Sequence, residues 1–95
     1  MEILLDQVKN HLDITWSDEG LEKKLTGIIK RGQKYLNAIA GKELDYSVDD
    51  KPLELLLEYC LYVRSNALNE FQKNYNHELN ALMLLKGDFN VETDI

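Results

Sequence analysis

The stretch LEKKLTGIIKRGQKYLNAIAG, residues 21–41, places its apolar and small side chains on one face of a helix. These side chains recur at intervals of three or four positions and comprise Leu21, Leu25, Ile28, Ile29, Gly32, Tyr35, Leu36 and Ile39. A period of about 3.6 residues is typical of an α-helix that buries one face. Gly41 follows as a stop signal, since glycine readily adopts the left-handed conformation that ends many helices. The stretch therefore predicts a long amphipathic helix.

Before this helix, a shorter apolar stripe predicts a first helix of two or three turns that ends near Ile14. Its members are Ile3, Leu4, Leu5, Val8 and Leu12. After the long helix, residues 42–51 are polar and acidic and predict a loop, which we expect to become ordered on contact with a partner. Pro52 then suits the first turn of a third helix, and Asp49 or Asp50 can cap it.

The run PLELLLEYCLYV, residues 52–63, is apolar on nearly every side. A helix with two apolar faces belongs at the centre of a bundle, so we expect Leu56, Cys60 and Val63 in the core. The apolar stripe continues to Met83, with a kink or break expected at residues 74–77, where NYNH contains weak helix formers. The remaining apolar members of the stripe are Ala67, Leu68, Phe71, Tyr75, Leu79 and Leu82.

The stretch DITWSDEG, residues 13–20, contains the single tryptophan of the chain. If Ser17 caps the long helix, Trp16 and Leu21 hold the two positions of a hydrophobic staple. We therefore expect the ring of Trp16 to be buried where the first two helices meet. Two alternatives remain: a competing cap set by Thr15 and Asp18, and a tryptophan that stacks on a ligand.

The apolar periodicity and the length of the chain together predict one small all-α domain of three to four helices around a long central helix. The chain has 95 residues, of which 44% are hydrophobic, and we place the domain at residues 1–86. Residues 87–95 are expected to form a flexible, acidic C-terminal tail. A formal net charge of −6 disfavours sequence-independent binding to nucleic acid or to anionic membranes. With one cysteine, no signal peptide and no membrane-length apolar run, we expect a soluble protein of a reducing cytoplasm.

Apparent catalytic and ligand-binding motifs fail on inspection, so we expect no enzyme activity, metal or cofactor. GIIKRGQK at residues 27–34 has the glycine spacing of a phosphate loop but lacks its lysine and hydroxyl positions. The calcium-loop pattern that starts at Asp45 lacks the turn glycine and the final glutamate. His77 and Glu78 open like a zinc-protease helix, but Ala81 replaces the second histidine. His11 and His77 are interpreted as solvated side chains.

Charge divides into two regions along the chain. Residues 21–35 hold five basic side chains and one acid, and the basic ones are Lys23, Lys24, Lys30, Arg31 and Lys34. Residues 42–58 hold an excess of acids, among them Asp45, Asp49, Asp50, Glu54 and Glu58. One interpretation is two solvated faces, as on many small helical domains. The sharper hypothesis is that the basic helix of one subunit faces the acidic residues of its neighbour, which gives a ring or a filament.

Three short patterns resemble the small head-tail connector, or adaptor, proteins of tailed bacteriophages and prophages. The acidic turn after the first helix is matched by Asp13, Ile14, Thr15, Trp16 and Asp18. The end of the second helix is matched by Tyr35, Leu36 and Gly41. The helix that follows a proline is matched by Pro52, Tyr62, Arg64, Asn66, Phe71 and Tyr75. The resemblance covers about residues 3–85.

The resemblance implies a structural subunit that assembles with copies of itself as a ring beneath the portal protein. Such a ring extends the DNA channel and docks the next connector or a tail protein, at the head-tail junction of the virion and, before assembly, in the bacterial cytoplasm. It implies no catalysis, no cofactor and no membrane contact. DNA would only pass through the channel, without being bound specifically. Acidity would then keep DNA from sticking to the channel wall, a hypothesis that fails if Lys23, Lys30 and Lys34 line the lumen.

Two other classes of function remain open from the sequence. The first is a small acidic helical regulator that binds one protein through Tyr59, Tyr62 and Tyr75, because tyrosine is enriched at interfaces. A one-to-one complex of a monomer would favour it. The second is a helix-turn-helix DNA binder, which has a basic helix but the wrong overall charge. DNA binding that weakens steeply with salt would favour that class.

Overall fold

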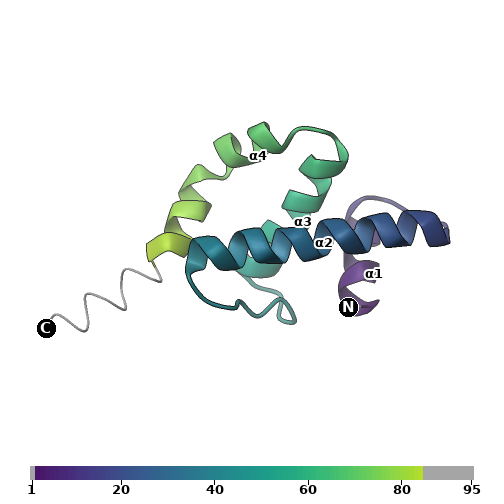
Figure 1. Cartoon of the computed structure of the whole chain (residues 1–95), viewed down its shortest axis with the longest axis horizontal. Coiled ribbons are helices and arrows are strands. Elements are labelled where there is room, and N and C mark those ends of the chain that lie inside the picture. Colours follow the sequence, from purple (N-terminus) through teal and green to yellow (C-terminus); the bar gives the residue numbers. More distant parts are fainter. Residues whose placement is uncertain (1, 85–95) are drawn as a thin grey trace, which may run out of the picture.

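The computed structural model describes residues 2–84, and within this range the protein is entirely helical (Figure 1). The elements are α1 (Glu2–His11), α2 (Glu19–Ala40), α3 (Lys51–Arg64), α4 (Leu68–Asn74) and a fifth helix over residues 76–84. The long helix α2 runs through the middle of the molecule and contacts α1 and α3 (Figure 1). Helix α3 in turn contacts α1, α2 and α4. The expected all-α class is confirmed, and the expected tail at residues 87–95 lies outside the described residues.

Three of the helices end in the same way, through a residue with left-handed backbone. These residues are Asp13, Gly41 and Asn66, with φ angles of 59°, 71° and 56°. After each one, the next amide donates back to a carbonyl in the last turn of the helix: Ile14 to Lys9, Lys42 to Asn37, and Ala67 to Tyr62. This is the Schellman arrangement, which satisfies carbonyl groups that a helix end leaves without partners. Gly41 was expected to end a helix and Asp13 to lie in the turn after the first helix, whereas no helix end was expected at Asn66.

The stripe after Pro52 is divided more often than the sequence predicts. Helix α3 ends at Arg64, and the left-handed Asn66 turns the chain before α4 begins at Leu68. Ser and Asn have low helix propensity, and Asn tolerates a positive φ, so residues 65–67 form a natural stop. The break expected at residues 74–77 is confirmed at Tyr75, which separates α4 from residues 76–84. The expected cap Asp50 and the first-turn Pro52 of α3 are also confirmed.

Helices α2 and α3 approach closely at Gly32. A Cβ atom at this position would lie 2.7 Å from Leu56 Cδ1 and 2.8 Å from Tyr59 Cδ1. Gly32, Leu56 and Tyr59 are all buried, and Leu56 is fully enclosed. The missing side chain of Gly32 therefore lets the two longest helices pack against each other. The predicted core positions Leu56 and Cys60 are confirmed as buried, while Leu21 and Val63 are partly buried against the core.

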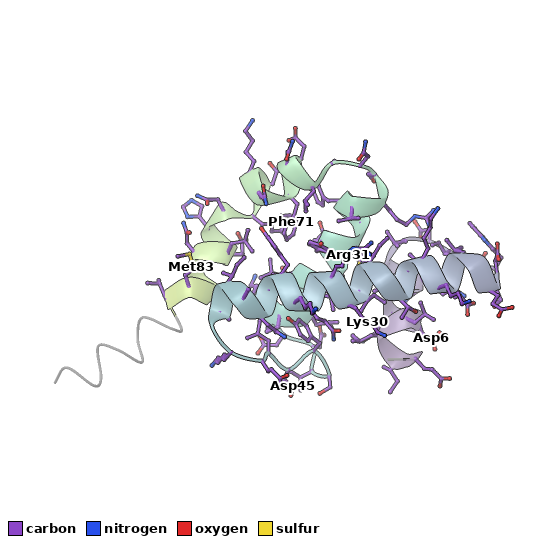
Figure 2. All side chains as sticks on the ribbon, in the orientation of Figure 1. Asp6, Lys30, Arg31, Asp45, Phe71 and Met83 are labelled. Atoms are coloured by element: carbon purple, nitrogen blue, oxygen red, sulfur yellow. The ribbon has the colours of Figure 1, made fainter. Side chains whose placement is uncertain are left out.

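A cluster of aromatic rings joins α4 to the two long helices. Phe71 lies at its centre, fully buried, with ring centroids 5.2–6.4 Å from those of its four neighbours. These neighbours are Tyr35, Tyr59, Tyr62 and Tyr75. Because a helix as short as α4 is only marginally stable alone, its position depends on this tertiary packing. Figure 2 shows Phe71 pointing from α4 toward α2.

The expected burial of Trp16 is wrong. Its side chain is 54% exposed, and the N-cap of α2 is Asp18 in place of Ser17. The carboxylate of Asp18 accepts a hydrogen bond of 3.0 Å from the amide of Gly20. A shift of the cap by one residue moves Trp16 out of the staple position, and the buried residue of the turn is Ile14 instead.

The thiol of Cys60 is fully buried, and this burial raises its pKa from 9.0 to about 12. Above about pH 9 the unfolded chain releases this proton while the native chain keeps it, so stability falls as pH rises toward 12. Between about pH 8.5 and pH 10 we expect the wild type to lose about 1 kcal/mol more stability than the Cys60→Ala variant. Urea denaturation of both proteins at the two pH values measures the difference. Equal losses would contradict the raised pKa.

Candidate interaction surface

The five basic residues predicted to form one patch lie on two sides of α2. Lys30 and Lys34 lie beside the loop that precedes α3, where they border a hollow with Glu43 and Tyr46. Lys24 and Arg31 lie on the side that faces α3. Figure 2 shows the same division, with Arg31 on the side of Phe71 and Lys30 on the side of Asp45. The fifth residue, Lys23, is exposed and lines neither hollow.

Lys24 and Arg31 are joined by a third cation, Arg64, at the end of α3. Together they border a groove of about 400 Å³, which we call the basic groove. Its other lining residues are apolar: Leu21, Leu25, Ile28 and Val63. No acidic residue lines the basic groove, and none of its three cations forms an ion pair with another described residue. The charge pattern along the sequence did not group Arg64 with these residues, because its place beside α2 depends on the helix end at Asn66.

The loop at residues 41–50 is held against α2 by a hydrogen-bonded tyrosine. The hydroxyl of Tyr46 donates to Asn37 Oδ1 at 2.8 Å, and the amide of Leu44 donates to the same oxygen at 3.0 Å. Tyr46 is 6% exposed, and its burial raises the pKa of the phenol to about 12. The loop is therefore anchored within the chain, which corrects the expectation that it needs a partner to become ordered.

Most acids of the predicted patch have structural roles within the same chain. Asp50 caps α3, and Glu54 pairs with Lys51 at 3.3 Å on an exposed helix face. Asp45 accepts hydrogen bonds from the amide and hydroxyl of Ser47, and these bonds lower the pKa of its carboxyl group. Asp49 is exposed. The acidic side of the predicted contact is therefore less available than the sequence indicates.

Glu58 was predicted to belong to the same patch, but its carboxylate links α3 to the end of α1 and to Tyr75, the residue that follows α4. Oε2 lies 2.6 Å from His11 Nε2 at the end of α1, and Oε1 accepts a hydrogen bond of 2.7 Å from the Tyr75 hydroxyl. That hydrogen bond raises the pKa of Tyr75 above its ordinary value. His11 is consequently not a purely solvated side chain. Glu58 holds α1 and α4 against α3 and is a poor candidate for an intersubunit contact.

The tyrosines proposed as anchors for a regulator also belong to the fold. Tyr59 is buried, and Tyr62 and Tyr75 are partly buried in the aromatic cluster. Five large apolar side chains are exposed instead: Ile3, Trp16, Val48, Met83 and Leu84. Trp16 lies in the turn before α2, and Met83 lies toward the opposite end of α2 along the molecule (Figure 2). The exposed apolar surface is thus divided between separate places.

Within residues 2–84, no group of three or more His, Cys, Asp or Glu side chains is arranged to hold a metal ion. None of the described helices has the length and apolar character needed to cross a membrane. Comparisons with protein-family models, with curated proteins and with solved structures each find no match for this chain.

Proposed function

We propose that this protein is a structural subunit of the head-tail connector of a tailed bacteriophage or prophage. The subunits assemble as a ring beneath the portal protein, extend the DNA channel, and dock the next connector or a tail protein. The observation that carries the proposal is the turn at residues 13–18, which resembles that of the connector family and leaves Trp16 exposed. An exposed tryptophan is well suited to an intersubunit contact, since Trp is enriched among residues that dominate binding energy.

The distribution of surface groups supports a head-to-tail contact. The basic groove, the exposed Trp16 and the exposed Met83 and Leu84 occupy different parts of one small subunit. A contact between two different patches repeats around a closed ring, whereas a twofold dimer needs a self-complementary patch. The proposal also places the excess of acids where DNA passes. A ring whose lumen is lined by Lys23, Lys30 and Lys34 in cryo-electron microscopy would contradict that part.

We expect the purified protein to form closed rings whose mass falls as salt increases, because charged contacts at a subunit boundary are screened. Light scattering over a concentration series at low and high salt measures the mass, and negative-stain images show whether large species are closed. The Trp16→Ala variant should assemble at least tenfold more weakly and keep the monomer fold, since this side chain is 54% exposed.

Ile3→Ala provides the matched control, because Ile3 is 75% exposed but lies on α1, outside the turn. It should assemble as the wild type does. A strict monomer under all conditions would contradict free assembly into a ring and would favour the regulator class, which a one-to-one complex with a single protein would then identify. Equal assembly by Trp16→Ala and the wild type would remove Trp16 from the contact.

A further inference from the structure

The basic groove has the chemistry of a site for an acidic peptide with apolar side chains. Its three cations, Lys24, Arg31 and Arg64, are exposed and have no ion-pair partner among the described residues. Its floor includes Leu25 and Ile28, which are 0% and 6% exposed. A volume of about 400 Å³ has room for a few side chains only. A ligand with carboxylates beside one or two apolar side chains fits this groove, since the carboxylates can pair with the cations and the apolar side chains can contact the floor.

The chain itself contains a segment of this kind outside the described residues. Residues 87–95, GDFNVETDI, carry three acids and no basic residue. Apolar Phe89 and Val91 alternate with Asp88, Asn90 and Glu92. In an extended peptide, alternate side chains point to opposite sides, so one side of this segment would be apolar and the other acidic. Such a peptide can place Phe89 on the floor of the basic groove while long cationic side chains reach its acids.

We propose that the basic groove of one subunit binds residues 87–95 of a second copy of the chain. The proposed ring needs a contact between subunits, and for this reason we place the segment in the groove of a second copy. Met83 lies toward the C-terminal end of α2 (Figure 2), and Lys24 lies about 24 Å back along that helix. Residues 84–88 span at most about 18 Å when fully extended. Asp88 of the same chain therefore does not reach Lys24, whereas Glu92, four residues further along, does. Binding of the segment within one chain is for this reason a competing outcome of the test.

This inference rests on the proposed function and names a second contact between neighbouring subunits, in addition to that of Trp16. It replaces the predicted contact between basic helix and acidic loop, because Asp50, Glu54 and Glu58 already have partners within the subunit. The acids of residues 87–95 are a different source of negative charge. Since groove and segment belong to different parts of the chain, each subunit offers one of each, and the contact repeats from copy to copy.

Paired charge reversal in the full-length protein tests the contact. One variant carries Lys24→Glu, Arg31→Glu and Arg64→Glu, and the other carries Asp88→Lys, Glu92→Lys and Asp94→Lys. We expect each variant alone to associate at least tenfold more weakly than the wild type, because groove and segment then carry the same sign. An equimolar mixture should regain association, with both variants in every large species, since each acidic groove meets a basic segment.

A matched control reverses Lys23, Lys30 and Lys34, three exposed lysines of α2 that do not line the basic groove. It changes the net charge by the same amount as the groove variant and should associate as the wild type does. Thermal unfolding followed by circular dichroism checks that all variants fold. A control that weakens association as much as the groove variant would overturn the inference, since net charge alone would then explain the effect.

The outcomes separate this inference from the proposed function. If the wild type forms rings that neither reversal weakens, the ring stands and the contact between groove and segment is wrong. The same result is expected if residues 87–95 bind the groove of their own chain, so it overturns the intersubunit contact. If the wild type forms only a small dimer that both reversals dissociate and mixing restores, the contact stands and the ring is wrong.

Discussion

Replacing Phe71 with alanine is expected to lower the free energy of unfolding by about 3–5 kcal/mol, the range measured for large aromatic side chains in well-packed cores. Phe71 is fully buried and contacts four tyrosine rings, with centroids as close as 5.2 Å. Truncation leaves a cavity that these rings cannot fill without leaving their own positions. For a domain of this size the loss corresponds to a fall in Tm of at least about 12 °C.

Urea denaturation followed by circular dichroism measures this effect. Met83→Ala is the control, because Met83 is 56% exposed and its truncation should change stability by about 0.5 kcal/mol or less. The loss of stability should be largest in α4, since this helix is held against α2 and α3 by Phe71. Amide hydrogen exchange in residues 68–74 should accelerate before that of α2. A loss below about 1 kcal/mol would show that the aromatic cluster does not organise this end of the core.

Gly32→Ala is expected to destabilise the protein, although alanine is the better helix former. Alanine in place of glycine within a helix contributes about 1 kcal/mol of stability. At Gly32, however, the added carbon would lie 2.7 Å from Leu56 and 2.8 Å from the Tyr59 ring. Helices α2 and α3 must then move apart or change rotamers in a filled core, which costs about 1–3 kcal/mol. With contacts this short we expect a net loss of about 1–2 kcal/mol.

Gly27→Ala is the matched control in the same helix. Its new carbon would lie 3.4 Å from Arg31 Nη1, the mobile end of a long side chain, and would contact no core atom. This variant should gain about 0.5–1 kcal/mol. The two substitutions are chemically identical, so opposite signs of their effects in urea denaturation isolate the approach of α3. A gain at both positions would show that α2 and α3 separate without cost.

Helix α2 could be predicted from the sequence because its stripe is long, regular and closed by glycine. The cap of α3 could also be predicted from the sequence, because Asp50 and Pro52 favour a helix start through local chemistry alone. The helix end at Asn66 was not predicted, because the apolar residues of the next helix continue with nearly the same spacing. The stripe in the sequence therefore shows no interruption at the break. The cap of α2 was misplaced because Ser17 and Asp18 both favour this position, and their side-chain type does not decide between them.

The candidate interaction surface was harder to predict for a different reason. Sequence proximity grouped all the basic residues of α2, but their positions around the helix separate Lys30 from Arg31. Arg64 joins Arg31 only because two helices meet, which no local pattern records. Likewise, the link between His11 and Glu58 joins residues far apart in the chain. Charge counts along a sequence reveal how much charge is present and not which charges remain available to a partner.

The left-handed residues Asp13, Gly41 and Asn66 have a consequence for how this molecule can diverge during evolution. At each of these residues the chain changes direction after a helix. The change depends on one backbone conformation and not on the side chains of the helix surfaces. Mutation can therefore replace most surface residues, and with them the binding partners, while the path of the chain is inherited unchanged. A distant homologue would keep residues that tolerate positive φ at these three positions, even where few other residues are identical.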